Sequence, residues 1–93
     1  IQGGIVPVDP LSMKPAIRCA HDDRMLADPK LRAKLTRSLP VADTDFAAYD
    51  IVFLAGGWGA AFDFAQSDAL AQRMSEAHAA GRILGGICHG PLG

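Results

Sequence analysis

The sequence has little of what would tie a protein to a membrane or to nucleic acid. Its 93 residues carry 9 basic and 10 acidic side chains without a cluster of either sign, so they offer no general attraction for phosphate backbones or anionic lipids. The longest apolar runs, at residues 51–55 and 83–87, are far shorter than the ~20 residues that a membrane-spanning helix needs. We therefore expect neither nucleic acid nor a membrane surface as a partner.

Cysteine is also scarce, which limits the class of protein further. The two cysteines, Cys19 and Cys88, are too few for the disulfide framework of a small secreted protein. The hydrophobic residues, at 49% of the sequence, suffice for a core without such bridges. No secretory signal is visible. We therefore expect a globular protein of the cytoplasm.

The first part of the chain predicts little regular structure. Prolines and glycines over residues 3–15 favour an irregular segment, and residues 19–23 are interpreted as a solvated loop. Asp28 followed by Pro29 is typical of a helix start, and leucines at four-residue spacing extend the pattern. This pattern predicts a short amphipathic helix over residues 29–39.

The second part predicts a β-strand, a helix and another β-strand. The apolar run 51–55 is typical of a strand buried on both faces, and a loop carrying Asp63 follows it. Ser67 is a suitable N-cap for a helix that ends at Gly81, and residues 83–87 form the second strand. This order predicts a parallel, right-handed βαβ unit.

Two strands and two helices are too few for a complete domain of this class. A parallel sheet needs helices on both faces, and Gly93 comes where the helix after the second strand should begin, with Pro91 near its first turn. We therefore expect residues 1–93 to be an interior piece of one larger α/β domain. The isolated piece is expected to be poorly folded and inactive.

The segment Gly86-Ile87-Cys88-His89-Gly90 has the form of a nucleophile elbow. Such an elbow holds a nucleophile at a sharp turn after a strand, and flanking glycines remove the Cβ atoms that would clash there. The backbone N–H groups of a following helix would favour the reactive thiolate. Cys88 is therefore the candidate nucleophile and His89 its candidate proton acceptor; the alternative is a small buried cysteine beside a glycine turn.

A second glycine-rich turn, Gly56-Gly57-Trp58-Gly59, follows the first strand. Its backbone N–H groups are candidates for binding an oxyanion, and the alternative is a tight turn that needs a positive φ, with Trp58 packed as a lid or a partner contact. The turn lacks the spacing of phosphate-binding and dinucleotide-binding loops. Cys19 and His21, without a second such pair, do not make a zinc site, so no metal or cofactor is expected.

These motifs together resemble the ThiJ/PfpI family of the class I glutamine amidotransferase-like superfamily, and above all its glyoxalase III-like and stress-chaperone-like branch. The likeness extends over nearly the whole chain in the right order. The segments that carry it are Gly4, Pro7, Asp9-Pro10 and Ser12, then Tyr49 to Gly59, Phe62-Asp63, and Ile87 to Pro91. The resemblance implies a flavodoxin-like, doubly wound parallel sheet in an α/β/α sandwich.

The resemblance also implies roles for residues of the two turns. The cysteine of the elbow, Cys88, would be the nucleophile and His89 would assist it, while backbone amides near Gly57 and His89 would form the oxyanion pocket. Trp58 stands where many relatives have a histidine. Relatives place a glutamate beside the thiol from a strand that would precede Ile1. A homodimer is implied as well.

The predicted function is a cofactor-independent, glyoxalase III-like conversion of 2-oxoaldehydes such as methylglyoxal to 2-hydroxy acids without glutathione. Its substrate would be a small-molecule aldehyde. Two alternatives remain open. One is acyl transfer by the same elbow, as in an amidase, a peptidase or a glutamine amidotransferase. The other is a non-catalytic stress chaperone or a redox sensor that uses reversible oxidation of Cys88.

Overall fold

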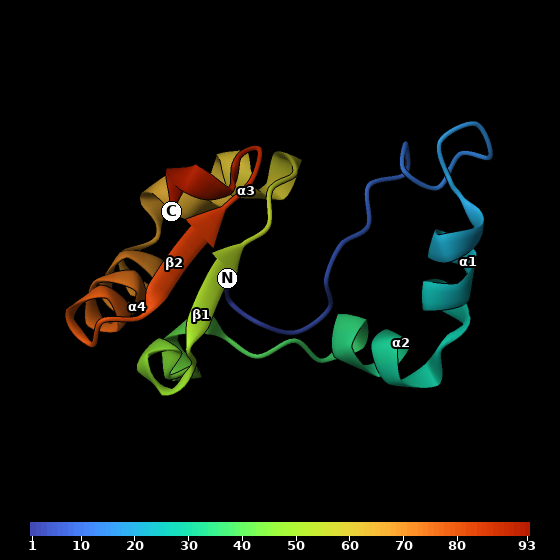
Figure 1. Ribbon diagram of the computed structural model, residues 1–93. Coiled ribbons are helices and arrows are strands. Elements are labelled where there is room, and N and C mark those ends of the chain that lie inside the picture. The colour runs from blue at the N-terminus through green and yellow to red at the C-terminus, as the bar shows by residue number, and fades with distance from the viewer. The chain divides into compact units, whose positions relative to one another are not determined.

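The computed structural model describes all 93 residues, which form two compact units. One unit comprises residues 1–2 and 40–93, and the other comprises residues 3–39. The larger unit contains the only sheet (Figure 1). No helix in either unit is long and apolar enough to cross a bilayer.

The unit of residues 3–39 contains two short helices, α1 (Ala20–Ala27) and α2 (Pro29–Thr36). Asp28 is the N-cap of α2, as predicted, since its side chain accepts a hydrogen bond from the Lys30 amide at 2.8 Å. The helix ends at Thr36 rather than at residue 39. The chain instead turns into an antiparallel bridge, in which the amides of Gly4 and Ser38 each donate to the other's carbonyl at 2.9 Å.

Residues 20–23 are helical, so the prediction of a loop over residues 19–23 is wrong. The Asp22 carboxylate accepts a hydrogen bond from the Cys19 amide at 2.8 Å and thereby satisfies one free amide at the start of α1. Asp22 and Asp23 both lie in the first turn, where the helix dipole favours negative charge. The acidic pair therefore starts a helix here.

The larger unit contains the predicted strand–helix–strand order. Strand β1 (Ile51–Leu54) pairs in parallel with β2 (Ile83–Gly86), with Ile51 opposite Ile83 and Leu54 opposite Gly86. Helix α4 (Asp68–Ala79) connects them and begins at Ser67, whose hydroxyl accepts a hydrogen bond from the Leu70 amide at 3.1 Å. Gly81 follows the helix with a φ of 72°, as expected of a helix-terminating glycine.

Residues 1–93 cover only one face of the sheet, so the second buried face that the sequence predicts for β1 is not covered within this chain. Side chains of β1 alternate, with Val52 and Leu54 buried and Ile51 and Phe53 exposed. The buried face packs against α4, and the core cluster consists of Val52, Leu54, Leu70 and Ala77. Two 3₁₀ turns, η1 (Val41–Asp43) and η2 (Phe46–Ala48), precede β1 and supply partly buried apolar side chains to this core.

The segment between β1 and α4 is helical rather than a loop. It forms α3 (Trp58–Asp63) and a 3₁₀ turn, η3 (Phe64–Gln66). Helix α3 begins after Gly57, which has a φ of 104° that residues with a side chain rarely adopt. Asp63 is the last residue of α3, and Ser67, not Asp63, caps the next helix.

Candidate functional site

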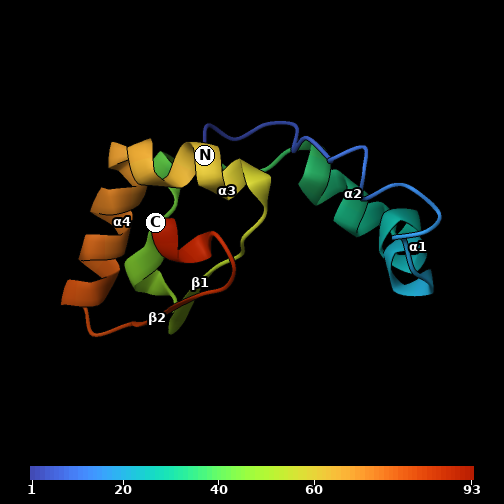
Figure 2. The ribbon, with the colours of Figure 1, turned by 90° about the horizontal axis from the view of Figure 1, so that it is seen from above.

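The candidate site lies where the two parallel strands end. Both strands run in the same direction, so the turns after Leu54 and after Gly86 leave the sheet at the same edge. Helix α3 and the 3₁₀ turn η4 (Gly90–Leu92) lie at this edge (Figures 1 and 2). This arrangement brings the two glycine-rich turns of the sequence together.

Cys88 occupies the tip of a tight turn at the end of β2. It is a free, exposed thiol and the only residue other than glycine with a positive φ, at 58°. The Ile87 amide still bonds to the Leu54 carbonyl at 3.2 Å, and the Gly90 amide turns back to the Ile87 carbonyl at 2.8 Å. Residues with side chains seldom adopt this left-handed conformation, and they concentrate at functional sites when they do. The geometry is that of the predicted elbow.

Two glycines permit this turn by their lack of a side chain. A Cβ atom on Gly90 would lie 2.0 Å from the Leu54 carbonyl oxygen. A Cβ atom on Gly56 would lie 2.6 Å from the Cβ of Cys88 and 2.9 Å from the amide nitrogen of His89. The first turn therefore lies directly against the second, and a larger residue at either glycine would displace the backbone that carries the thiol.

His89 contacts both the Cys88 thiol and the Trp58 indole ring. Its Nδ1 is 3.6 Å from the Cys88 Sγ, within hydrogen-bonding distance for sulfur. Its ring centroid is 5.4 Å from that of Trp58, with an angle of 33° between the ring planes. The imidazole is thus placed to exchange a proton with the thiol, and it also packs against the indole ring.

Backbone amides around the thiol provide hydrogen-bond donors. The N–H groups of Gly57, Cys88 and His89 donate no hydrogen bond within the chain. Such unsatisfied amides beside a nucleophile can bind the negative oxygen that forms when a carbonyl carbon is attacked. The site therefore brings together a candidate nucleophile, a candidate proton carrier and candidate donors to an oxyanion.

The predicted site residues differ in how closely they approach Cys88. Gly56 and His89 lie directly against Cys88, whereas Trp58 contacts His89. Gly59 lies one residue further along α3, and a Cβ atom built on it would meet no atom within 4 Å. Neither Cys88 nor His89 hydrogen-bonds to a carboxylate of this chain.

The remaining candidate residues lie elsewhere. Cys19, His21 and Asp22 belong to the unit of residues 3–39, and His78 is exposed in the last turn of α4. No three His, Cys, Asp or Glu side chains come close enough together to hold a metal ion. The Asp22 carboxylate caps α1 by accepting a hydrogen bond from the Cys19 amide, and this hydrogen bond holds the pKa of Asp22 below its ordinary value of 3.8.

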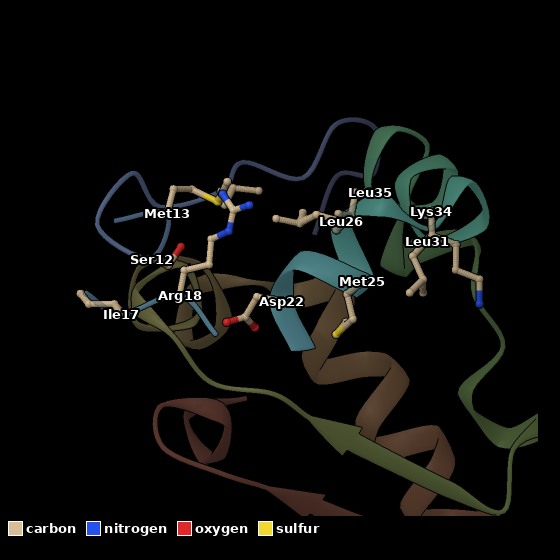
Figure 3. A pocket seen from close by; sticks show the side chains of 11 residues that line it. Ser12, Met13, Ile17, Arg18, Asp22, Met25, Leu26, Leu31, Lys34 and Leu35 are labelled. Carbon is tan, nitrogen blue, oxygen red and sulfur yellow. The ribbon is translucent and has the colours of Figure 1, made fainter. Parts of the chain in front are cut away.

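A separate hollow of about 450 Å³ lies within the unit of residues 3–39 (Figure 3). Apolar side chains of α1 and α2 form much of its wall, and Arg18, Asp22 and Lys34 are the charged residues at it. Arg18 forms an ion pair with Asp23. None of the predicted site residues lines this hollow, so its size does not bear on the chemistry at Cys88.

Sequence reasoning missed one residue beside the site. Phe62 is exposed on α3 and follows Trp58 by four residues, so both side chains lie on the same side of the helix. The Trp58-x-x-x-Phe62 spacing was the available signal. Interpreting the segment that carries Phe62 and Asp63 as a loop concealed it.

Comparisons with known proteins show which family and which structures the chain resembles. A family model described as the DJ-1/PfpI family matches residues 4–93. The chain is 35% identical over 51 residues to a protein of Schizosaccharomyces pombe described as a probable glutathione-independent glyoxalase, hsp3104. It is 30% identical to the crystal structure of the Rapid Encystment Protein of 24 kDa (REP24) from Francisella tularensis, with a TM-score of 0.87.

The matches cover different shares of the two relatives. The S. pombe match covers 55% of this chain and 23% of the yeast protein, and the REP24 match covers 99% of this chain and 40% of that structure. The chain therefore spans well under half the length of either relative. The structural likeness confirms the predicted fold class, a flavodoxin-like α/β fold with a parallel sheet.

Proposed function

The chain belongs to the DJ-1/PfpI family, and from this premise we propose that it carries the nucleophile of a glyoxalase that acts without glutathione. Cys88 is the nucleophile, and 2-oxoaldehydes such as methylglyoxal are the substrates. The observation that carries the proposal is the exposed Cys88 thiol at a positive φ of 58°, with the His89 imidazole 3.6 Å away. The description of the S. pombe relative as a glyoxalase supports the same reaction.

The proposed reaction begins with addition of the Cys88 thiolate to the aldehyde carbon. A carbon–sulfur bond forms, and the electron pair of the carbonyl double bond moves to its oxygen, giving a hemithioacetal. The free amides of Gly57 and His89 are the proposed donors to this oxyanion. His89 accepts the thiol proton and can return a proton to the substrate.

The oxidation and reduction then occur within the substrate. A base removes the hydrogen of the former aldehyde carbon as a proton, and a proton is delivered to the adjacent carbon, so that the first carbon is oxidised and the second is reduced. Water hydrolyses the resulting thioester to a 2-hydroxy acid and releases the thiol. Because no electrons leave the substrate, the proposed reaction needs no redox cofactor.

The test is consumption of methylglyoxal by the complete protein and by two matched cysteine variants. Cys88→Ser removes the nucleophile and is expected to abolish lactate formation, whereas Cys19→Ser changes the other exposed thiol, in the other unit, and is expected to retain it. Unchanged turnover in Cys88→Ser would refute the proposal.

The same variants separate the alternative functions. Release of ammonia from glutamine or cleavage of a peptide, lost in Cys88→Ser, would indicate acyl transfer instead. Protection of an aggregating client protein that survives Cys88→Ser, without any turnover, would indicate a chaperone. Thiol chemistry of this kind suits a reducing compartment, so we propose a cytoplasmic location.

A further inference from the structure

Trp58 is the aromatic residue whose ring contacts His89. It is the first residue of α3, and 68% of it is exposed, although it lies at the carboxyl edge of the sheet beside the elbow. Its indole ring contacts one other ring, the imidazole of His89. The His89 imidazole contacts both the Cys88 thiol, at 3.6 Å from Nδ1 to Sγ, and the Trp58 indole, at 5.4 Å between ring centroids, so one side chain links the nucleophile to the indole.

A second exposed aromatic ring extends this apolar surface. Phe62, 71% exposed, follows Trp58 by one helical turn on α3, and residues at this spacing are neighbours on a helix surface. The site therefore combines exposed aromatic rings on α3, one of which contacts His89, with free backbone amides in the turns at Gly57 and Cys88. Sites of this composition bind ligands with an apolar body and a polar reacting group.

We propose that Trp58 determines specificity and selects 2-oxoaldehydes with an aromatic substituent over those with a methyl group. This inference rests on the proposed function for the identity of the reacting group. When the aldehyde carbon is bound to Cys88, a methyl substituent is too small to reach past the imidazole, whereas an aryl ring can pack against the indole. Contacts between aromatic rings are worth enough to raise the rate for the aryl substrate about three- to tenfold.

The inference can be tested without turnover, by alkylation of Cys88 in the complete protein. Phenacyl bromide and bromoacetone share the reacting group and differ in carrying a phenyl or a methyl substituent; in both, the thiolate forms a carbon–sulfur bond as bromide leaves. The measured quantity is the ratio of the two rates at Cys88, mapped by peptide mass and divided by the ratio for free cysteine. A Cys19→Ser background removes the other exposed thiol.

Three variants give the expected pattern. Trp58→Leu lowers the phenyl-to-methyl ratio about three- to tenfold, and Trp58→Phe retains most of it. Tyr49→Leu leaves the ratio unchanged, since Tyr49 is also an exposed aromatic but precedes β1 at the opposite end of the strand from Cys88. Circular dichroism establishes that each variant is folded.

The outcomes distinguish this inference from the proposed function. A ratio that is the same in Trp58→Leu and in the parent protein overturns the role of Trp58, even if the protein consumes methylglyoxal. A ratio that falls in Trp58→Leu and is retained in Trp58→Phe supports it, even if no 2-oxoaldehyde is consumed. In the turnover assay, the same Trp58→Leu change should lower kcat/KM for phenylglyoxal about three- to tenfold more than kcat/KM for methylglyoxal.

Discussion

Replacing Gly56 with alanine tests how the first turn positions the nucleophile. The added Cβ would lie 2.6 Å from the Cβ of Cys88, 2.6 Å from the Ile87 carbonyl oxygen and 2.9 Å from the His89 amide nitrogen. Carbon atoms in favourable contact are about 3.5–4.0 Å apart, so the two turns must separate by about 1 Å. No rotation of a side chain relieves the overlap, since two of the three neighbours are backbone atoms.

The structure gives the expected size of two effects. Overpacking costs about 1–3 kcal/mol, and we expect the upper end, about 3 kcal/mol, because the overlap is with backbone on the elbow itself. A displacement of about 1 Å at a reacting group lowers its rate by about 10²-fold. The free energy of unfolding and the rate at Cys88 should therefore both fall.

Urea unfolding and alkylation of Cys88 by iodoacetamide measure these effects in the complete protein. Gly85→Ala is the matched control, because its Cβ would lie 3.1 Å from a side-chain atom of Phe53, whose exposed ring can turn away. It is expected to change the free energy of unfolding by less than about 1 kcal/mol. A Gly56→Ala protein with the stability and alkylation rate of the parent would refute the placement of Gly56 against the elbow.

Further predictions concern the backbone strain at Cys88, the packing of the core and the stability of α1 at low pH. Cys88→Gly should raise the free energy of unfolding by about 0.5–1 kcal/mol relative to Cys88→Ala, because the left-handed strain that glycine relieves is larger than the extra conformational entropy that glycine loses on folding. Equal stability of the two variants in urea would contradict this. Leu70→Ala should lower it by about 2–4 kcal/mol, since Leu70 is 1% exposed, and a loss below 1 kcal/mol would place Leu70 outside the core. The pKa of Asp22 is lowered mainly by the hydrogen bond from the Cys19 amide, so its stabilisation of α1 should be present above pH 3.8 and lost as the pH falls through the lowered value. Amide hydrogen exchange over residues 20–27 measures this, and Asp22→Asn should remove the pH dependence.

The sequence predicted those elements whose ends carry local signals. Ser67 and Gly81 bound α4, and Asp28 with Pro29 starts α2, because caps act through hydrogen bonds to the nearest backbone groups. Helix α1 was missed because it begins after a cysteine rather than at one of the usual capping residues. Helix α3 was missed because it contains Gly59, and a helical glycine costs about 1 kcal/mol relative to alanine.

The candidate site was predictable in its location but not in its contacts. Parallel strands end at the same edge of a sheet, so the order of the chain alone brings Gly56 near Cys88. The ring contact between Trp58 and His89 depends on how α3 leaves Gly57, with its φ of 104°. No periodicity in the sequence encodes that angle, and the distance from the thiol to the imidazole likewise depends on the backbone at Cys88.

The antiparallel bridge between Gly4 and Ser38 has a consequence for how the chain can vary. Its two backbone hydrogen bonds, each 2.9 Å long, and the hydrogen bond from the Ser38 hydroxyl to the Gly4 carbonyl hold the two ends of the unit of residues 3–39 together. Lengthening a loop costs free energy only as the logarithm of its length. Changes of length within residues 5–37 should therefore leave the order of β1, α4 and β2 intact.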